Sequence, residues 1–94
     1  MQNHFSKGLM AGLTSEDVKP ATELTRFCSD YKRGYVLGYA HHCAENSGDG
    51  NHAAYQAGLL CKEYGLDSEL VAEFFSGGEN RLPVRFFMAG YNAD

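Results

Sequence analysis

The stretch Y-K-R-G-Y-V-L-G-Y-A-H-H, residues 31–42, decides the fold that this sequence predicts. Its tyrosines recur every four residues with a glycine in each interval: Tyr31, Gly34, Tyr35, Gly38 and Tyr39. On a helix with 3.6 residues per turn, these five positions fall on one stripe. We interpret the stripe as a packing surface, because a glycine without Cβ lets a neighbouring helix or ring lie against the backbone.

The same pattern, an aromatic residue followed by glycine three positions later and then by leucine or tyrosine, recurs along the chain. It occurs at 5–9, 31–35, 35–39, 55–59 and 87–91, whereas composition alone would give about a fifth of one occurrence. Each glycine inside a helix costs about 0.8–1 kcal/mol relative to alanine, so a compensating contact is required. The irregular spacing excludes a solenoid and indicates several helices that share one kind of contact.

Periodicity predicts a single all-α domain over 1–94 with four to five helices. We expect a short helix over 2–12, a long central helix over about 20–46, a helical hairpin over about 52–75, and a last helix over 81–91. Turn-forming residues at 46–51 and 77–80 separate these helices. No segment alternates with period two for long enough to predict a sheet.

Single residues mark the expected ends of the later helices. Gly65 fits a left-handed position after a helix, and Asp67 and Asn80 fit N-caps. Pro83 is tolerated in the first turn of the last helix. Between Asp67 and residue 75, four apolar side chains are expected to face inward: Leu70, Val71, Phe74 and Phe75.

Length and composition bound the protein further. A chain of 94 residues makes one domain with a small core, burying about 60–65% of its unfolded surface. The sequence has no apolar run of membrane-spanning length, and its first residues lack the basic start and long apolar stretch of a signal peptide. Its three cysteines, an odd number, predict reduced thiols. We therefore expect a cytoplasmic protein with no membrane segment.

The charge distribution argues against nucleic-acid binding. The formal net charge is −4, and five acids follow one another without an intervening lysine or arginine: Glu63, Asp67, Glu69, Glu73 and Glu79. This run predicts an acidic side of the molecule. Sequence-independent binding to a polyanion needs a basic surface instead.

Four segments together resemble one known family. These are N-H-F-S-K-G-L-M-A-G-L (3–13), F-C-S-D-Y-K-R-G-Y-V-L-G-Y (27–39), Y-G-L-D (64–67) and R-F-F-M-A-G-Y (85–91). They are similar to the YghW-like family of small uncharacterised enterobacterial proteins, and the similarity covers nearly the whole chain. The resemblance implies a bacterial, stand-alone protein of this length. It implies no activity, ligand or functional residue.

The leading functional hypothesis is a non-catalytic protein–protein interaction module that binds an unknown partner protein or associates with itself. Tyrosine is favoured at interfaces because its large ring loses little conformational entropy on binding. The candidate interaction residues are Tyr31, Lys32, Arg33, Tyr35 and Tyr39, with Gly34 and Gly38 as helix-contact glycines.

Two alternatives involve nucleic acid. The R-G-Y-x-x-G within 33–38 resembles a motif of the small ribosome modulation factor, which would make Lys32 and Arg33 contacts for ribosomal RNA; that family is basic throughout, whereas this chain is acidic. The segment 61–75 has the spacing of a helix-turn-helix, but its second helix would present Glu69 and Glu73 to DNA.

The sequence carries no motif for catalysis, for a metal or for a cofactor. His41, His42 and Cys43 are consecutive, so on a helix they point about 100° apart and cannot converge on one ion. The chain also lacks the C-x-x-C and H-x-x-x-H spacings that zinc favours. Any cysteine could be paired with any histidine on paper, which identifies no nucleophile. We therefore expect no enzyme activity.

Overall fold

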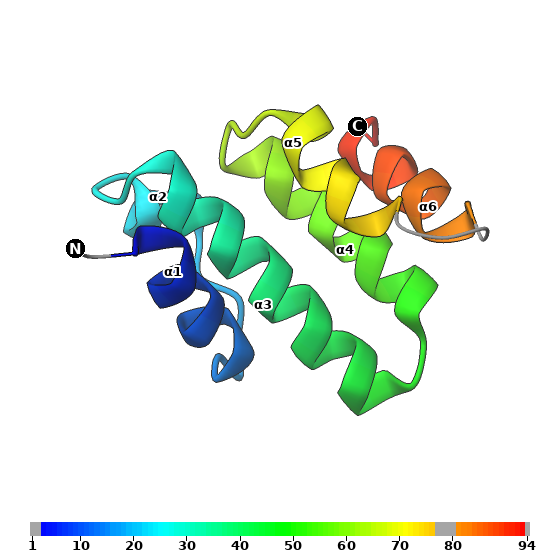
Figure 1. Ribbon diagram of the computed structural model, residues 1–94, viewed down its shortest axis with the longest axis horizontal. Helices are drawn as coiled ribbons and strands as arrows, with labels where there is room; N and C mark the ends of the chain where they lie inside the picture. The colour runs from blue at the N-terminus through cyan, green and yellow to red at the C-terminus, as the bar shows by residue number, and fades with distance from the viewer. Residues whose placement is uncertain (1–2, 77–80, 94) are drawn as a thin grey trace.

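The computed structural model describes residues 3–76 and 81–93, and within these ranges the regular structure is entirely helical (Figure 1). The elements are α1 (His4–Leu13), α2 (Ala21–Leu24), α3 (Ser29–Ser47), α4 (Gly50–Glu63), α5 (Ser68–Ala72), the 3₁₀ turn η1 (Glu73–Phe75) and α6 (Leu82–Tyr91). The predicted all-α class is confirmed. The predicted turn at 77–80, including the Asn80 cap, lies outside the described residues.

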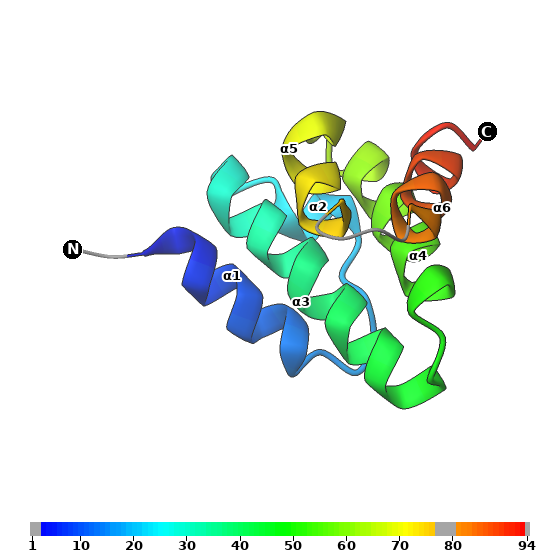
Figure 2. The same cartoon turned by 45° about the vertical axis from the view of Figure 1, so that its right-hand side comes forward.

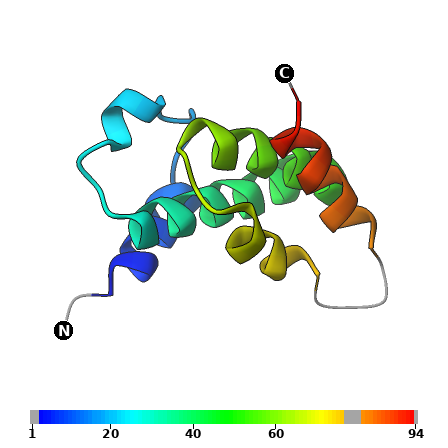
Figure 3. The ribbon, with the colours of Figure 1, turned by 90° about the horizontal axis from the view of Figure 1, so that it is seen from above.

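Four helices lie side by side in the order α1, α3, α4, α6 (Figures 1 and 3). The tight turn at Gly48 and Asp49 makes α3 and α4 antiparallel neighbours. Seen from above, α2 lies on one side of this row and α5 on the other. The row is therefore the frame of the molecule, and the two short helices cover its two faces.

The prediction of one helix over about 20–46 is wrong, because residues 25–28 separate α2 from α3. The amide of Phe27 donates to the Leu24 carbonyl (3.1 Å), and Cys28 is extended, with φ −72° and ψ 167°. This bend lets Leu24 enter the core, where it is fully buried, and stacks Phe27 on Tyr31 at 4.0 Å between ring centroids. The apolar period is the same on both sides of the bend, so periodicity alone could not reveal it.

The expected hairpin over about 52–75 is correct only in its first half. Gly65 adopts φ +72°, and the Asp67 carboxylate accepts from the Glu69 amide at 2.9 Å, as predicted. The second helix, however, ends after five residues and tightens into η1. Tightening to three residues per turn changes the direction of the last side chains. The inward prediction is wrong for Phe74, which lies in this turn and is 59% exposed, and also for Leu70, which lies in α5 itself and is 44% exposed.

The core is built on α3 and α4, with single large side chains from the other elements. The largest fully buried side chains are Tyr35, Phe87, Leu24, Val36, Val71 and Cys61. Burial raises the pKa of the Cys61 thiol to about 11, because a buried thiolate lacks solvation. Helix α1 contributes only Gly8 and Gly12 as buried residues, so it is held by a different kind of contact.

Candidate interaction surfaces

Gly34 and Gly38 lie where the backbone of α3 touches the backbone of α1. A Cβ added to Gly34 would overlap with the Phe5 carbonyl oxygen and lie 2.8 Å from the Leu9 nitrogen. A Cβ added to Gly38 would overlap with the Leu9 carbonyl oxygen. The glycine hydrogens in these places point at the carbonyls, as in the weak Cα–H···O contacts found between closely packed helices.

The contact is reciprocal. A Cβ added to Gly8 would overlap with the Tyr31 carbonyl oxygen. A Cβ added to Gly12 would overlap with the Tyr35 carbonyl oxygen and lie 2.6 Å from the Tyr39 nitrogen. Gly8 pairs with Gly34, and Gly12 pairs with Gly38. Each glycine faces the carbonyl of the residue three positions before the other glycine of its pair. Rising residue numbers on α1 meet rising numbers on α3, so the two helices run parallel.

The same arrangement joins α4 to α6. A Cβ at Gly58 would overlap with the Phe87 carbonyl oxygen and lie 2.7 Å from the Tyr91 nitrogen, and one at Gly90 would overlap with the Tyr55 carbonyl oxygen. This second pair is parallel as well. The recurrent sequence pattern thus marks two helix pairs with one geometry.

The tyrosine stripe lies largely within this packing. Tyr35 is fully buried, and its hydroxyl accepts from the Lys19 amide at 3.0 Å. It also donates to Ser15 Oγ at 3.0 Å, since the Ser15 hydroxyl itself donates to the Asp17 carbonyl. Tyr31 and Tyr39 are half-buried. Tyr35 is therefore unavailable to a partner, and its hydroxyl holds the 14–20 segment on the row of helices.

Arg33 and the Phe27 ring already have partners within the protein. Arg33 forms an ion pair with Asp30, and its side chain is only 20% exposed. The nearby Phe27 ring has Tyr31 stacked on it and the Arg26 guanidinium 5.0 Å from its centroid. A nucleobase would need an open ring face for stacking, and Phe27 already has two neighbours that occupy this role.

The structure also places the residues of the helix-turn-helix hypothesis and the histidines that were considered as metal ligands. Helix α5, the recognition helix of the helix-turn-helix hypothesis, has five residues and continues directly into η1. His41 pairs with Glu45 at 3.0 Å, and His42 with Asn46 at 3.0 Å. Among residues 3–76 and 81–93, no group of three His, Cys, Asp or Glu side chains lies close enough to hold a metal ion.

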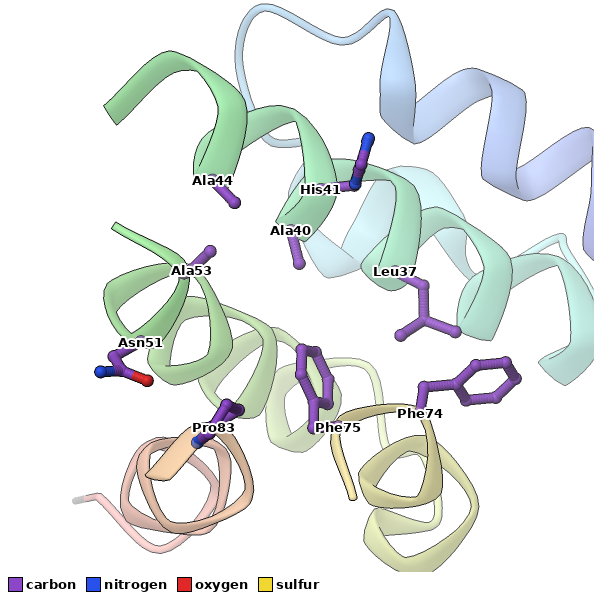
Figure 4. Close-up of a pocket in the computed structure, with 10 residues that line it drawn as sticks. Leu37, Ala40, His41, Ala44, Asn51, Ala53, Phe74, Phe75 and Pro83 are labelled. Carbon is purple, nitrogen blue, oxygen red and sulfur yellow. The ribbon is translucent and has the colours of Figure 1, made fainter. Parts of the chain in front are cut away.

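A groove of about 540 Å³ opens between α3, the start of α4, η1 and the start of α6 (Figure 4). Leu37, Ala40 and Ala44 line it from α3, and Phe74, Phe75 and Pro83 line it from the opposite side. His41, Gly50, Asn51 and Ala53 complete the lining. We call this feature the alanine groove, because alanine side chains from two helices point into it.

The groove combines a small-residue floor with an aromatic wall. Ala40 and Ala53 are 4% and 2% exposed and form part of the core. Phe74, in contrast, is 59% exposed although its ring stacks on Phe5 at 5.7 Å between centroids. Phe75 stacks on the buried Phe87 at 5.4 Å, which fixes the wall. The result is a depression lined largely by apolar residues, with one large ring at its edge.

A family model described as "Protein of unknown function (DUF2623)" matches residues 1–93 of the chain. The chain belongs to this family. No solved structure matches it. In the part of this DUF2623 chain that the structure describes, no helix is both long and apolar enough to cross a membrane.

The sequence did not reveal the alanine groove. The spacing of Leu37, Ala40, His41 and Ala44 follows one helical face, and this was the available signal. The early end of α5 leaves this face of α3 open at Ala40 and Ala44. Nothing in the 67–75 segment signals where α5 becomes a 3₁₀ turn.

Proposed function

We propose that this protein is a non-catalytic interaction module whose alanine groove binds an apolar helical segment of a partner protein. The observation that carries the proposal is the exposure of Phe74 beside the apolar lining. Aromatic residues, phenylalanine included, are enriched at the cores of protein–protein interfaces. The proposed contact surface therefore lies across α3 from the glycine contacts, not on the tyrosine stripe.

The shape of the groove favours a helix as its occupant. Ala40 and Ala44 are one turn apart on α3 and lie along the groove (Figure 4). Small side chains leave room for the larger ones of an approaching helix, as in ridges-into-grooves packing. Amphipathic helices that bind in hydrophobic grooves are a recurring mode of recognition.

A role without catalysis and without a cofactor fits the lining. Among the described residues that line the groove, His41 is the only ionisable one, and Glu45 is its partner. Nucleophilic catalysis would require a nucleophile within reach of such a base. The free thiols of Cys28, Cys43 and Cys61 agree with a reducing compartment. We include a cytoplasmic location and an enterobacterial, YghW-like origin in the proposal.

Affinity capture with matched variants tests the proposal. Ala44→Phe fills the groove floor, and Ala89→Phe adds the same volume at an exposed site on α6. Phe74→Ser removes the exposed ring, and Met10→Ser removes an equally exposed side chain, also 59%, from α1. We expect one discrete partner to be retained by the two controls and reduced about tenfold or more by the two groove variants. Equal capture by all four folded variants would contradict the role of the groove.

A further inference from the structure

The charged groups along the α3 and α4 edge of the alanine groove are carboxylates. Glu45 lies one turn beyond His41 on α3, and its side chain is 69% exposed. Asp49 directly precedes Gly50, which lines the groove, and its carboxylate accepts from the His52 amide at 3.0 Å. On the opposite wall, Glu73 is exposed and directly precedes Phe74. We call Glu45, Asp49 and Glu73 the acidic rim.

Arg81, which directly precedes α6, and Arg85 in α6 face a different hollow. Arg81 and Arg85 line a separate depression of about 260 Å³ together with Ser76 and Val84. Pro83, which lines the alanine groove, lies two positions from each arginine, and side chains two positions apart on a helix point to nearly opposite sides. The formal charges that adjoin the lining residues on α3, α4 and η1 are thus negative, with His41 and His52 as the groups there that can become positive.

We infer that the partner segment is a basic amphipathic helix, in which lysine or arginine residues border the apolar stripe and face the acidic rim. This inference rests on the docking role proposed above and adds the charge of the partner to it. Opposite charges at the rim of an interface affect mainly the choice of partner and the association rate. An acidic helix of the same apolar content would meet like charges and bind more weakly.

Three fluorescein-labelled peptides of equal length test the inference with the full chain. The first is an amphipathic helix with a leucine stripe bordered by lysines, and the second has glutamates in place of the lysines. The third is the lysine peptide with its residue order scrambled, so that the charge is retained and the stripe is lost. Fluorescence anisotropy at low salt and at about 300 mM salt, where screening is strong, gives the binding constants.

Two charge variants separate the rim from the net charge. Glu45→Gln/Asp49→Asn/Glu73→Gln neutralises the rim, and the asparagine keeps the N-cap of α4, since asparagine and aspartate cap about equally well. Glu16→Gln/Asp17→Asn/Glu23→Gln changes the net charge equally at exposed positions in the 14–24 segment. We expect the lysine helix to bind about tenfold more tightly than the glutamate helix at low salt. This ratio should fall to about twofold in the rim variant and persist in the control variant.

The binding experiment distinguishes a failure of the inferred partner charge from a failure of the proposed docking role. If the two amphipathic helices bind equally well, or if the rim variant keeps the tenfold ratio, the inferred partner charge is overturned while docking stands. If neither amphipathic helix binds more tightly than the scrambled peptide, the docking role itself is overturned, and the inference with it.

Discussion

The two glycine-mediated helix pairs use one geometry with different amounts of side-chain support. In the α1–α3 pair each helix contributes two glycines, and α1 buries no residue other than glycine. In the α4–α6 pair each helix contributes one glycine, and Phe87 of α6 is fully buried as well. The first pair therefore depends on backbone contact itself, whereas the second also has conventional core packing. Substitutions can test this difference directly.

The largest effect is expected at Gly38 in the α1–α3 pair. Gly38→Ala should destabilise the protein by about 2–3 kcal/mol, since the new methyl group meets the backbone of Leu9 and Leu13, which cannot rotate away. Helix propensity alone would give the opposite sign, a gain of about 0.8–1 kcal/mol. Urea unfolding followed by circular dichroism measures the change. Gly50→Ala is the matched control, because a Cβ there meets nothing within 4 Å; a gain in stability at both sites would contradict the contact.

The corresponding change in the other pair, Gly58→Ala, should cost about 1–2 kcal/mol. The Phe87 and Tyr91 backbone atoms would be displaced, but the buried Phe87 ring still holds α6 in place.

Amide hydrogen exchange compares the two helix pairs within one molecule. We expect Gly38→Ala to expose the amides of α1 and leave those of α6 protected, and Gly58→Ala to weaken α6 with α1 protected. Uniform loss of protection in both variants would show that the two pairs are not separate.

Much of this fold could be predicted from the sequence, for physical reasons that differ between regions. The glycine pattern within 31–39 indicated close contact because glycine in a helix needs compensation, and Gly65 and Asp67 indicated helix ends because their local chemistry is specific. The pattern could not indicate which two helices pack together, since all its occurrences along the chain are alike. The bend at Cys28 and the early end of α5 depend on tertiary contacts of Leu24 and Phe75. The groove follows from those contacts, so sequence reasoning missed it.

The hydrogen bonds of the tyrosine hydroxyls are expected to contribute less to stability than the glycine contacts. The Tyr64 hydroxyl donates to the Lys19 carbonyl at 2.6 Å, and the Tyr35 hydroxyl accepts from the amide of the same residue. Tyr64→Phe should cost about 1 kcal/mol, since a typical hydrogen bond contributes about that much. Thermal unfolding measures the loss, and Tyr55→Phe in α4 is the control, because Tyr55 is half-buried and belongs to the glycine contact only through its backbone. Equal losses in both variants would contradict the assigned role.

The last prediction concerns stability at alkaline pH. Burial raises the pKa of the Tyr64 phenol above its ordinary 10.0 and that of the Cys61 thiol from 9.0 to about 11. The folded state thus favours the neutral forms, so their contribution to stability is full below pH 9 and is lost as pH rises through the raised pKa values. Urea midpoints should fall between pH 8.5 and pH 10.5. The fall should be smaller in Cys61→Ala, compared at equal starting stability, and an unchanged slope would exclude the thiol as a cause.

An NMR titration tests most directly whether the open surface is the alanine groove rather than the tyrosine stripe. The ¹⁵N-labelled protein is titrated with the amphipathic peptide whose leucine stripe is bordered by lysines. The changes in amide chemical shift are then mapped on the structure. We expect the largest shifts at Ala40, Ala44, Ala53 and Phe74, with Tyr31 and Lys32 unaffected. Shifts centred on Tyr31, Lys32 and Tyr39, with the groove silent, would contradict the proposal and return the interaction surface to the tyrosine helix.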